Sequence, residues 1–124
     1  KDLAGWRGGD TFDHRRLLEL PAAERAAKID PRQAHGSAYG MVAAARGYQR
    51  SIGEWNFQDV TIKGSTIRVE LNGTVILDSD LARVDLTKVV AQKPHPGKDR
   101  TSGFCGFAGH NDAVEFKDIS IRKL

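Results

Sequence analysis

An Asn72-Gly73 dipeptide between two apolar stretches is the feature that most restricts how this chain can fold. In the preceding stretch, Ile67, Val69 and Leu71 alternate with polar residues, which is the period-two pattern of a strand with one buried face. An Asn-Gly pair tolerates the positive φ angles of a type I′ hairpin turn. The sequence therefore predicts a hairpin whose second strand covers residues 74–77.

A third strand is predicted directly before this hairpin. Val60 and Ile62 fall on the same face as Asn56 and Gln58, and the stretch ends at the turn cluster Lys63-Gly64-Ser65. Three consecutive antiparallel strands follow from this spacing. We therefore expect an all-β fold.

Several ordered motifs resemble the bacterial 3-keto-disaccharide hydrolase domain family. They are the opening KDLAGW, the segment HGSAYG, the long stretch GEWNFQDVTIKGSTIRVELNGTVILD and the closing GFCGFAGHNDAVEFKDISIRKL. The resemblance implies a concanavalin A-like jelly-roll sandwich of antiparallel strands. It also implies a carbohydrate substrate that is already oxidised at its 3-position.

The middle of the chain departs from that family. The family has an acidic strand of the Glu-x-Gln-x-x-Asp kind and an Asn-Ser-Gly segment before its Gly-x-x-Tyr-Gly motif. In this chain Ile29-Asp30-Pro31-Arg32-Gln33 leads almost directly into the motif at 35–40, so we expect missing residues or a shortening between Asp30 and Ala34. An incomplete sandwich leaves an apolar face uncovered, and we expect a homo-oligomer or a complementing chain to cover it.

The expected organisation is one domain with a distinct N-terminal part. Residues 1–33 are interpreted as a turn-rich arm followed by one helical segment over 13–29, and residues 34–124 as the strands of a single β-sandwich domain. The single cysteine, Cys105, excludes an intrachain disulfide, and we expect it to be buried in a short strand. A parity break between Phe116 and Ile119 predicts a β-bulge near Lys117-Asp118.

Charge and hydropathy argue against two classes of partner. The net charge is +3, but Lys and Arg are scattered without a run, so nucleic acid is not expected. No apolar run is long enough to span a membrane, and no membrane partner is expected. We expect a periplasmic or secreted protein whose leader has been removed.

The resemblance implies chemistry at the C2 position of the sugar. A 3-ketone acidifies the C2 hydrogen, so cleavage by elimination needs a base near C2, an acid near the leaving oxygen and a group that stabilises the enolate. We take His110 and His35 as the candidate catalytic residues. The candidate substrate-binding residues are Tyr39, Trp6, Glu54 and Asp112.

Each candidate also has a structural interpretation. His35 could be a turn residue that bonds the backbone, Glu54 could be structural within its Gly-Glu-Trp-Asn motif, and aromatic residues such as Tyr39 and Trp6 are commonly buried in a core. His110 lies in Ala108-Gly109-His110-Asn111, where the family usually has Gln-Asp-His-Gly.

No cofactor and no metal are expected. His110 and Asp112 supply two possible ligands in one loop, and two ligands do not define a metal site. Three functions remain open: cleavage of 3-keto-glycosides, non-catalytic lectin-like carbohydrate binding, and completion of a partner's β-sheet by this chain.

Overall fold

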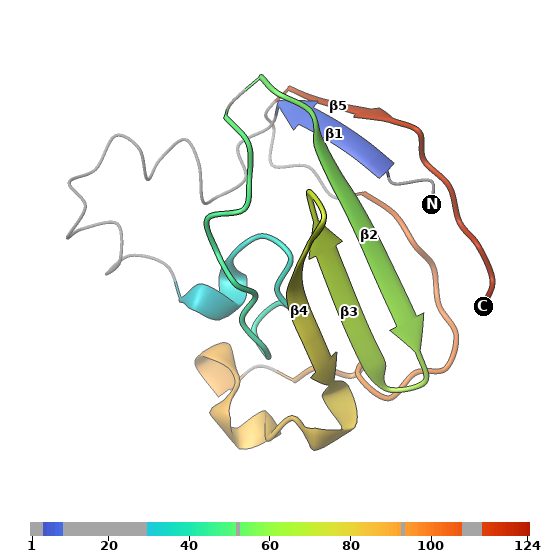
Figure 1. Cartoon of the computed structure of the whole chain (residues 1–124). Helices are drawn as coiled ribbons and strands as arrows, with labels where there is room; N and C mark the ends of the chain where they lie inside the picture. The colour runs from blue at the N-terminus through green and yellow to red at the C-terminus, as the bar shows by residue number, and fades with distance from the viewer. Residues whose placement is uncertain (1–3, 9–29, 52, 93, 108–112) are drawn as a thin grey trace.

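The computed structural model describes residues 4–8, 30–51, 53–92, 94–107 and 113–124, with the backbone alone for 4–8. Its strands form one five-stranded sheet in which every neighbouring pair is antiparallel (Figure 1). Across the sheet the order is β4 (Thr74–Asp80), β3 (Thr66–Leu71), β2 (Asn56–Lys63), β1 (Ala4–Gly8) and β5 (Val114–Lys117). Four short 3-10 turns accompany them: η1 (Pro31–Gln33), η2 (Leu81–Arg83), η3 (Leu86–Lys88) and η4 (Val90–Gln92).

This architecture confirms the predicted all-β class. The jelly-roll sandwich stays a prediction, because the described residues form a single sheet. The helical segment expected over 13–29 lies outside the described residues. Between Asp30 and Ala34 the chain runs continuously through η1, and its shortening relative to the family stays a prediction.

Two tight turns connect β2 to β3 and β3 to β4, as the alternating pattern predicts. Asn72 and Gly73 both have positive φ angles, 50° and 86°, which is the combination that a type I′ turn requires. The paired register runs from Lys63 opposite Thr66 to Gln58 opposite Leu71. The hairpin and the three consecutive strands are therefore confirmed.

The first strand comes from a segment that the sequence suggests is turn-rich. In β1, Trp6 is paired with Asn56 of β2 on one side and with Phe116 of β5 on the other. Two of its five residues are glycine, which is depleted in strands, so local propensity does not indicate a strand here. Pairing with residues of β2 and β5, which are distant in the sequence, stabilises this segment as a strand.

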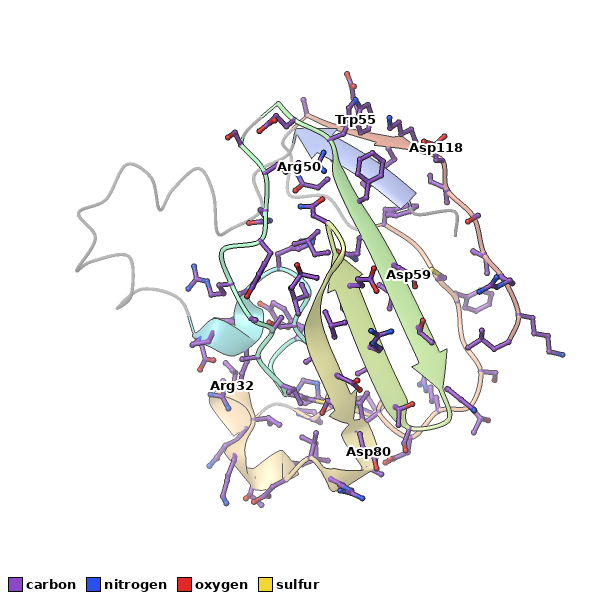
Figure 2. All side chains as sticks on the ribbon, in the orientation of Figure 1. Arg32, Arg50, Trp55, Asp59, Asp80 and Asp118 are labelled. Atoms are coloured by element: carbon purple, nitrogen blue, oxygen red, sulfur yellow. The ribbon has the colours of Figure 1, made fainter. Side chains whose placement is uncertain are left out.

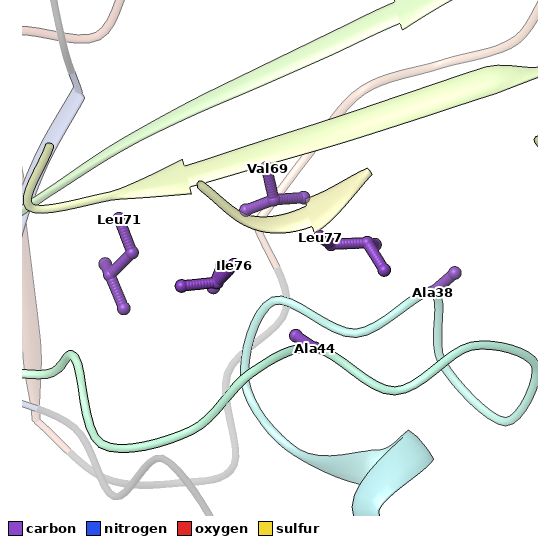
Figure 3. Packing of buried hydrophobic residues seen from close by; sticks show 6 residues of the cluster. All are labelled: Ala38, Ala44, Val69, Leu71, Ile76 and Leu77. Carbon is purple, nitrogen blue, oxygen red and sulfur yellow. The ribbon is translucent and has the colours of Figure 1, made fainter. Parts of the chain in front are cut away.

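One side of the sheet, called the inner face here, carries the core. Val69, Leu71 and Leu77 are at most 4% exposed on this face, and Ile76 joins them. The segment 34–45 covers them with small side chains, including Ala38 and Ala44, as Figure 3 shows. The Ala45 amide donates to the Ile76 carbonyl at 2.7 Å, which fixes this segment to β4.

Gly36 sits where a side chain would not fit. Its φ is +79°, and an added Cβ would run into the Cδ1 atom of Ile76 and approach Val69 at 3.6 Å. Glycine is the residue that accepts both this conformation and this proximity. The close contact brings the 34–45 segment against the sheet.

Two expectations about the C-terminal part were wrong. Cys105 is exposed, in a stretch over 103–107 that forms no strand. The predicted bulge at Lys117-Asp118 is instead the end of β5, where Asp118 takes a φ of 53° and pairing stops. The register irregularity lies elsewhere, between Val69 and Glu70 on β3 where it pairs with β4.

A pair of side-chain amides joins the start of β2 to the hairpin turn. Asn56 is 3% exposed, and its Oδ1 accepts from the Arg50 amide at 2.8 Å and from Asn72 Nδ2 at 2.9 Å. Asn72 Nδ2 also donates to the Tyr48 carbonyl at 2.7 Å, and Asn72 Oδ1 accepts from the Phe57 amide at 2.9 Å. The network therefore satisfies three backbone groups, two from the 48–50 segment and one from β2.

Replacement of Asn72 separates the two contributions of this residue. We expect Asn72→Gly to lower the free energy of unfolding by about 1–2 kcal/mol, because the amide bonds are lost while the positive φ stays favourable. Asn72→Ala should lose roughly 1 kcal/mol more, since alanine disfavours that φ. Urea unfolding followed by tryptophan fluorescence measures both, and a glycine variant as stable as the parent would contradict the role of the amide.

Candidate functional site

The turn that contains two of the predicted site residues begins with a tightly bonded ion pair. Asp30 Oδ1 accepts from the Arg32 backbone amide at 2.9 Å and from Arg32 Nε at 2.8 Å, and Asp30 Oδ2 accepts from Arg32 Nη2 at 2.6 Å. Arg32 Nη1 also donates to the Lys88 carbonyl. The Arg32 guanidinium thus connects the start of the turn to η3. Figure 2 labels Arg32.

His35 reaches from this turn to the sheet. Its Nε2 lies 2.6 Å from Oε1 of Gln58, a β2 residue that is opposite Leu71 on the inner face. An amide oxygen only accepts hydrogen bonds, so Nε2 carries the proton and, in the neutral ring, the lone pair lies on Nδ1. Gln58 therefore selects the tautomer and orients the ring.

Tyr39 occupies the exposed side of the same turn. Its side chain is 64% exposed, and its hydroxyl oxygen accepts from Gln33 Nε2 at 3.0 Å. A hydroxyl that accepts in this way keeps its own proton available for donation. The expected alternative of core burial is therefore wrong for Tyr39.

The other predicted site residues are not joined to this turn by any contact of the described residues. Glu54 Oε2 accepts from the Ser51 amide at 3.0 Å within its own turn, in line with its structural interpretation. Trp6 lies on β1, where the backbone alone is described. His110 and Asp112 lie outside the described residues, so the association of His110 with the 35–39 turn stays a prediction.

Sequence reasoning missed the residue that holds His35. Gln58 falls on the inner face by its strand parity, but its partner lies 23 positions earlier in the chain, and parity alone does not identify that partner. The Asp30–Arg32 pair was missed as well. Its local signal is an Asp that caps a turn with proline at the first position, as Asp30 does at Pro31.

The opposite side of the sheet, called the polar face here, gathers charged and aromatic groups. Lys117 Nζ lies 4.5 Å from the ring centroid of Trp55 and 5.4 Å from that of Phe57. The Arg50 guanidinium carbon lies 5.6 Å from the Phe57 centroid. Such cation–aromatic contacts at a partly exposed surface contribute about 0.5–1 kcal/mol each.

Carboxylates continue the polar face along β2 and β3. Asp59 is directly opposite Glu70, a like-charge pair that opposes strand pairing, and Arg68 lies 3.9 Å from both Glu70 and Asp78. Figure 2 labels Trp55, Arg50 and Asp59 along this part of the sheet. Hydrogen-bonding and aromatic groups thus occur on one accessible surface.

The described part of the chain holds no group of three or more His, Cys, Asp or Glu residues that could bind a metal ion. Its helical turns are too short to provide a membrane-spanning helix.

The Asp30 carboxyl should titrate well below an ordinary aspartate. The Arg32 side-chain hydrogen bonds, followed by the Arg32 backbone bond, lower the pKa of Asp30 from 3.8 to about 2. A depressed pKa stabilises the folded state above about pH 3.8, and this contribution disappears as the pH falls through about 2. Carboxyl ¹³C NMR should give a midpoint near 2 in the parent and a return toward 3.8 in Arg32→Met. Equal midpoints would show that Arg32 is not the cause.

Comparisons with known proteins address the family of this fold. The model of the 3-keto-α-glucoside-1,2-lyase-like domain matches residues 10–122. The crystal structure of a "putative glycosyl hydrolase" from Parabacteroides distasonis ATCC 8503 is similar, with a TM-score of 0.48 and 19% identity over 67% of this chain and 53% of that one. The chain therefore spans about half the length of that solved structure. No curated protein matches. Because the family model covers nearly the whole sequence, the chain belongs to the 3-keto-α-glucoside-1,2-lyase-like domain family.

Proposed function

We propose that this domain cleaves 3-keto-glycosides by elimination, with His35 as the base. The observation that carries the proposal is the 2.6 Å contact between His35 Nε2 and Gln58 Oε1. A base must be presented in one tautomer and one orientation, and this contact supplies both. Family membership supports a glycoside hydrolase or lyase activity, and the 3-keto substrate belongs to the proposal.

The proposed reaction uses the acidity of the hydrogen next to the ketone. His35 removes the C2 proton, and the electrons of the C2–H bond form a C1=C2 double bond through the enolate. The C1–O bond breaks, its electron pair stays on the leaving oxygen, and a proton donor converts that oxygen to a hydroxyl. Without the ketone, the C2 hydrogen is not acidic enough for a base of imidazole strength.

Tyr39 is the proton donor that the turn offers. Its hydroxyl accepts from Gln33 and keeps its own proton, and its exposure allows a substrate to approach. His110 is proposed as a second catalytic group at this surface, with Asp112, Trp6 and Glu54 in substrate binding. Expected stacking of a pyranose on the Tyr39 ring is compatible with the donor role.

Replacement of His35 tests the proposal directly. With a 4-nitrophenyl 3-keto-glucoside as substrate, His35→Ala should lower turnover roughly 10²-fold or more, as expected for loss of a general base. Added imidazole should restore part of the activity, which repair of a purely structural defect would not explain. The unoxidised 4-nitrophenyl glucoside should stay uncleaved.

Solvent isotope exchange identifies the step. In D₂O the parent should incorporate deuterium at C2 of the 3-keto sugar, and His35→Ala should lose this exchange, while Tyr39→Phe should retain exchange and lose cleavage. Undiminished turnover in His35→Ala, at an unchanged melting temperature, would remove His35 from the mechanism.

The polar face favours a second candidate function, lectin-like carbohydrate binding. Trp55 and Phe57 lie beside Lys117, Arg50 and Asp59, and apolar ring faces with nearby hydrogen-bonding groups are the elements from which sugar sites are built. This function needs no base and does not involve His35.

An NMR titration with neutral disaccharides distinguishes the two functions. If the polar face binds sugar, Phe57→Ala should weaken binding about tenfold, and Tyr39→Ala, on the other site, should leave it unchanged. Resonance shifts confined to the 35–39 turn would exclude the polar face as the sugar site.

A further inference from the structure

The Asn72-Gly73 turn contains a chemically labile pair of residues that the proposed function does not use. Asparagine side chains are among the thermolabile groups of proteins. When glycine follows, no side chain hinders the glycine amide nitrogen from reaching the asparagine Cγ atom. Gly73 is exposed, and an added Cβ there would meet no atom within 4 Å. The turn is therefore a candidate site of hydrolytic modification as well as the closure of the hairpin.

In the folded chain, hydrogen bonds hold the whole Asn72 carboxamide. Nδ2 donates to the Tyr48 carbonyl at 2.7 Å and to Asn56 Oδ1 at 2.9 Å, and Oδ1 accepts from the Phe57 amide at 2.9 Å. Nδ2 is the group that leaves during deamidation, so both of its hydrogen bonds must break before the reaction can finish. The side chain is also half-buried. Deamidation therefore requires this network to open first.

The product of deamidation does not fit the same network. A carboxylate has no hydrogen to donate, so the oxygen that replaces Nδ2 would lie 2.7 Å from the Tyr48 carbonyl oxygen and 2.9 Å from Asn56 Oδ1. Rotation of the Asn56 amide does not repair this contact, because its Oδ1 also accepts from the Arg50 backbone amide at 2.8 Å. The Arg50 guanidinium donates to the Trp55 carbonyl at 3.1 Å. Two hydrogen bonds are therefore replaced by contacts between acceptors.

We infer that Asn72 is a deamidation site that is closed in the folded hairpin and becomes reactive when the turn network opens. The Gly73 amide nitrogen loses its proton to hydroxide and bonds to Asn72 Cγ. The Cγ–Nδ2 bond breaks, and Nδ2 takes a proton from water and leaves as ammonia, so that a cyclic imide remains. Water then adds to one carbonyl carbon of the imide, the bond from that carbon to the ring nitrogen breaks, and the nitrogen regains a proton. Water is the only co-reactant.

Both products of this hydrolysis oppose the return of the hairpin. Attack of water at Cγ gives aspartate, which places a carboxylate in the network. Attack at the backbone carbonyl carbon gives isoaspartate, which adds a carbon to the main chain of a two-residue turn and disturbs the strand register that the turn sets. The turn therefore marks chains that have opened and removes them from the folded population.

Peptide mapping by mass spectrometry tests the inference on the full chain without any substitution. One sample is incubated in buffer and another in concentrated urea, at the same pH and temperature. Asn72 should deamidate about tenfold or more faster in urea, because modification of an opened state scales with the population of that state. Asn56, which is followed by the bulky Phe57, should react much more slowly than Asn72 in urea and is the internal control. Equal rates at Asn72 in both samples, or no reaction in urea, would overturn the inference.

A set of variants tests whether the product is incompatible with the fold. Asn72→Asp reproduces one product, and Asn72→Ala removes the amide without adding a carboxylate. At neutral pH, Asn72→Asp should unfold at a lower urea concentration than Asn72→Ala, although aspartate tolerates a positive φ better than alanine. Ser102→Asp, which adds the same charge at an exposed residue, should unfold with the parent. An Asn72→Asp variant that fails to fold under conditions where Asn72→Ala folds agrees with the inference. One that is at least as stable as Asn72→Ala would overturn it.

Discussion

The hydrogen bond between the amides of Asn56 and Asn72 is the interaction on which the rest of the sheet depends. The two residues belong to separate motifs, Gly-Glu-Trp-Asn and Asn-Gly, and each has a local role, one at the start of β2 and one in the hairpin turn. Their contact joins the start of β2 to the turn between β3 and β4. It therefore fixes the position of that turn relative to β2. The buried Asn56 also accepts from the Arg50 amide, so the incoming 48–50 segment is fixed by the same network.

The residues on the inner face of the sheet differ between the two sides of this network. Toward β4 the inner face is apolar and covered, and the 34–45 segment brings His35 onto Gln58 at the border of that cover. Elsewhere on the same face Val60 and Ile62 of β2 and Phe116 of β5 are exposed, while the reverse side carries cations next to aromatic rings. A candidate catalytic site and a candidate sugar surface therefore lie on opposite sides of one sheet.

The features that the sequence predicts correctly are those that depend on residues close together in the chain. The Asn72-Gly73 hairpin and the parity of Val69 and Leu71 follow from turn geometry and alternation, and both are confirmed. Alternation assigns Val60 to the same face as Val69 but does not say whether another layer covers it, so their exposures of 47% and 3% were not predictable. The prediction that Cys105 is buried was wrong for the same reason, because burial depends on which distant segment covers a residue.

The candidate site, too, was predicted from the sequence only in part. Sequence reasoning selected His35 because turns commonly carry functional groups, and Tyr39 because an aromatic ring can stack on a pyranose. It did not find Gln58 or the Arg32 bond to Lys88, since both contacts join residues far apart in the sequence. The strand at 4–8 was missed because its two glycines disfavour a strand and only its partners stabilise one.

The position of β1 between β2 and β5 has a consequence for how the chain folds. The hairpins of β2, β3 and β4 close short loops and can form early, whereas among the described strands β5 pairs only with β1, and the paired residues Trp6 and Phe116 lie more than a hundred positions apart. Closing so long a loop is entropically costly and slow. During synthesis, β1 must therefore wait for β2 to emerge, and then offers an unpaired edge to any strand in solution until β5 has been made.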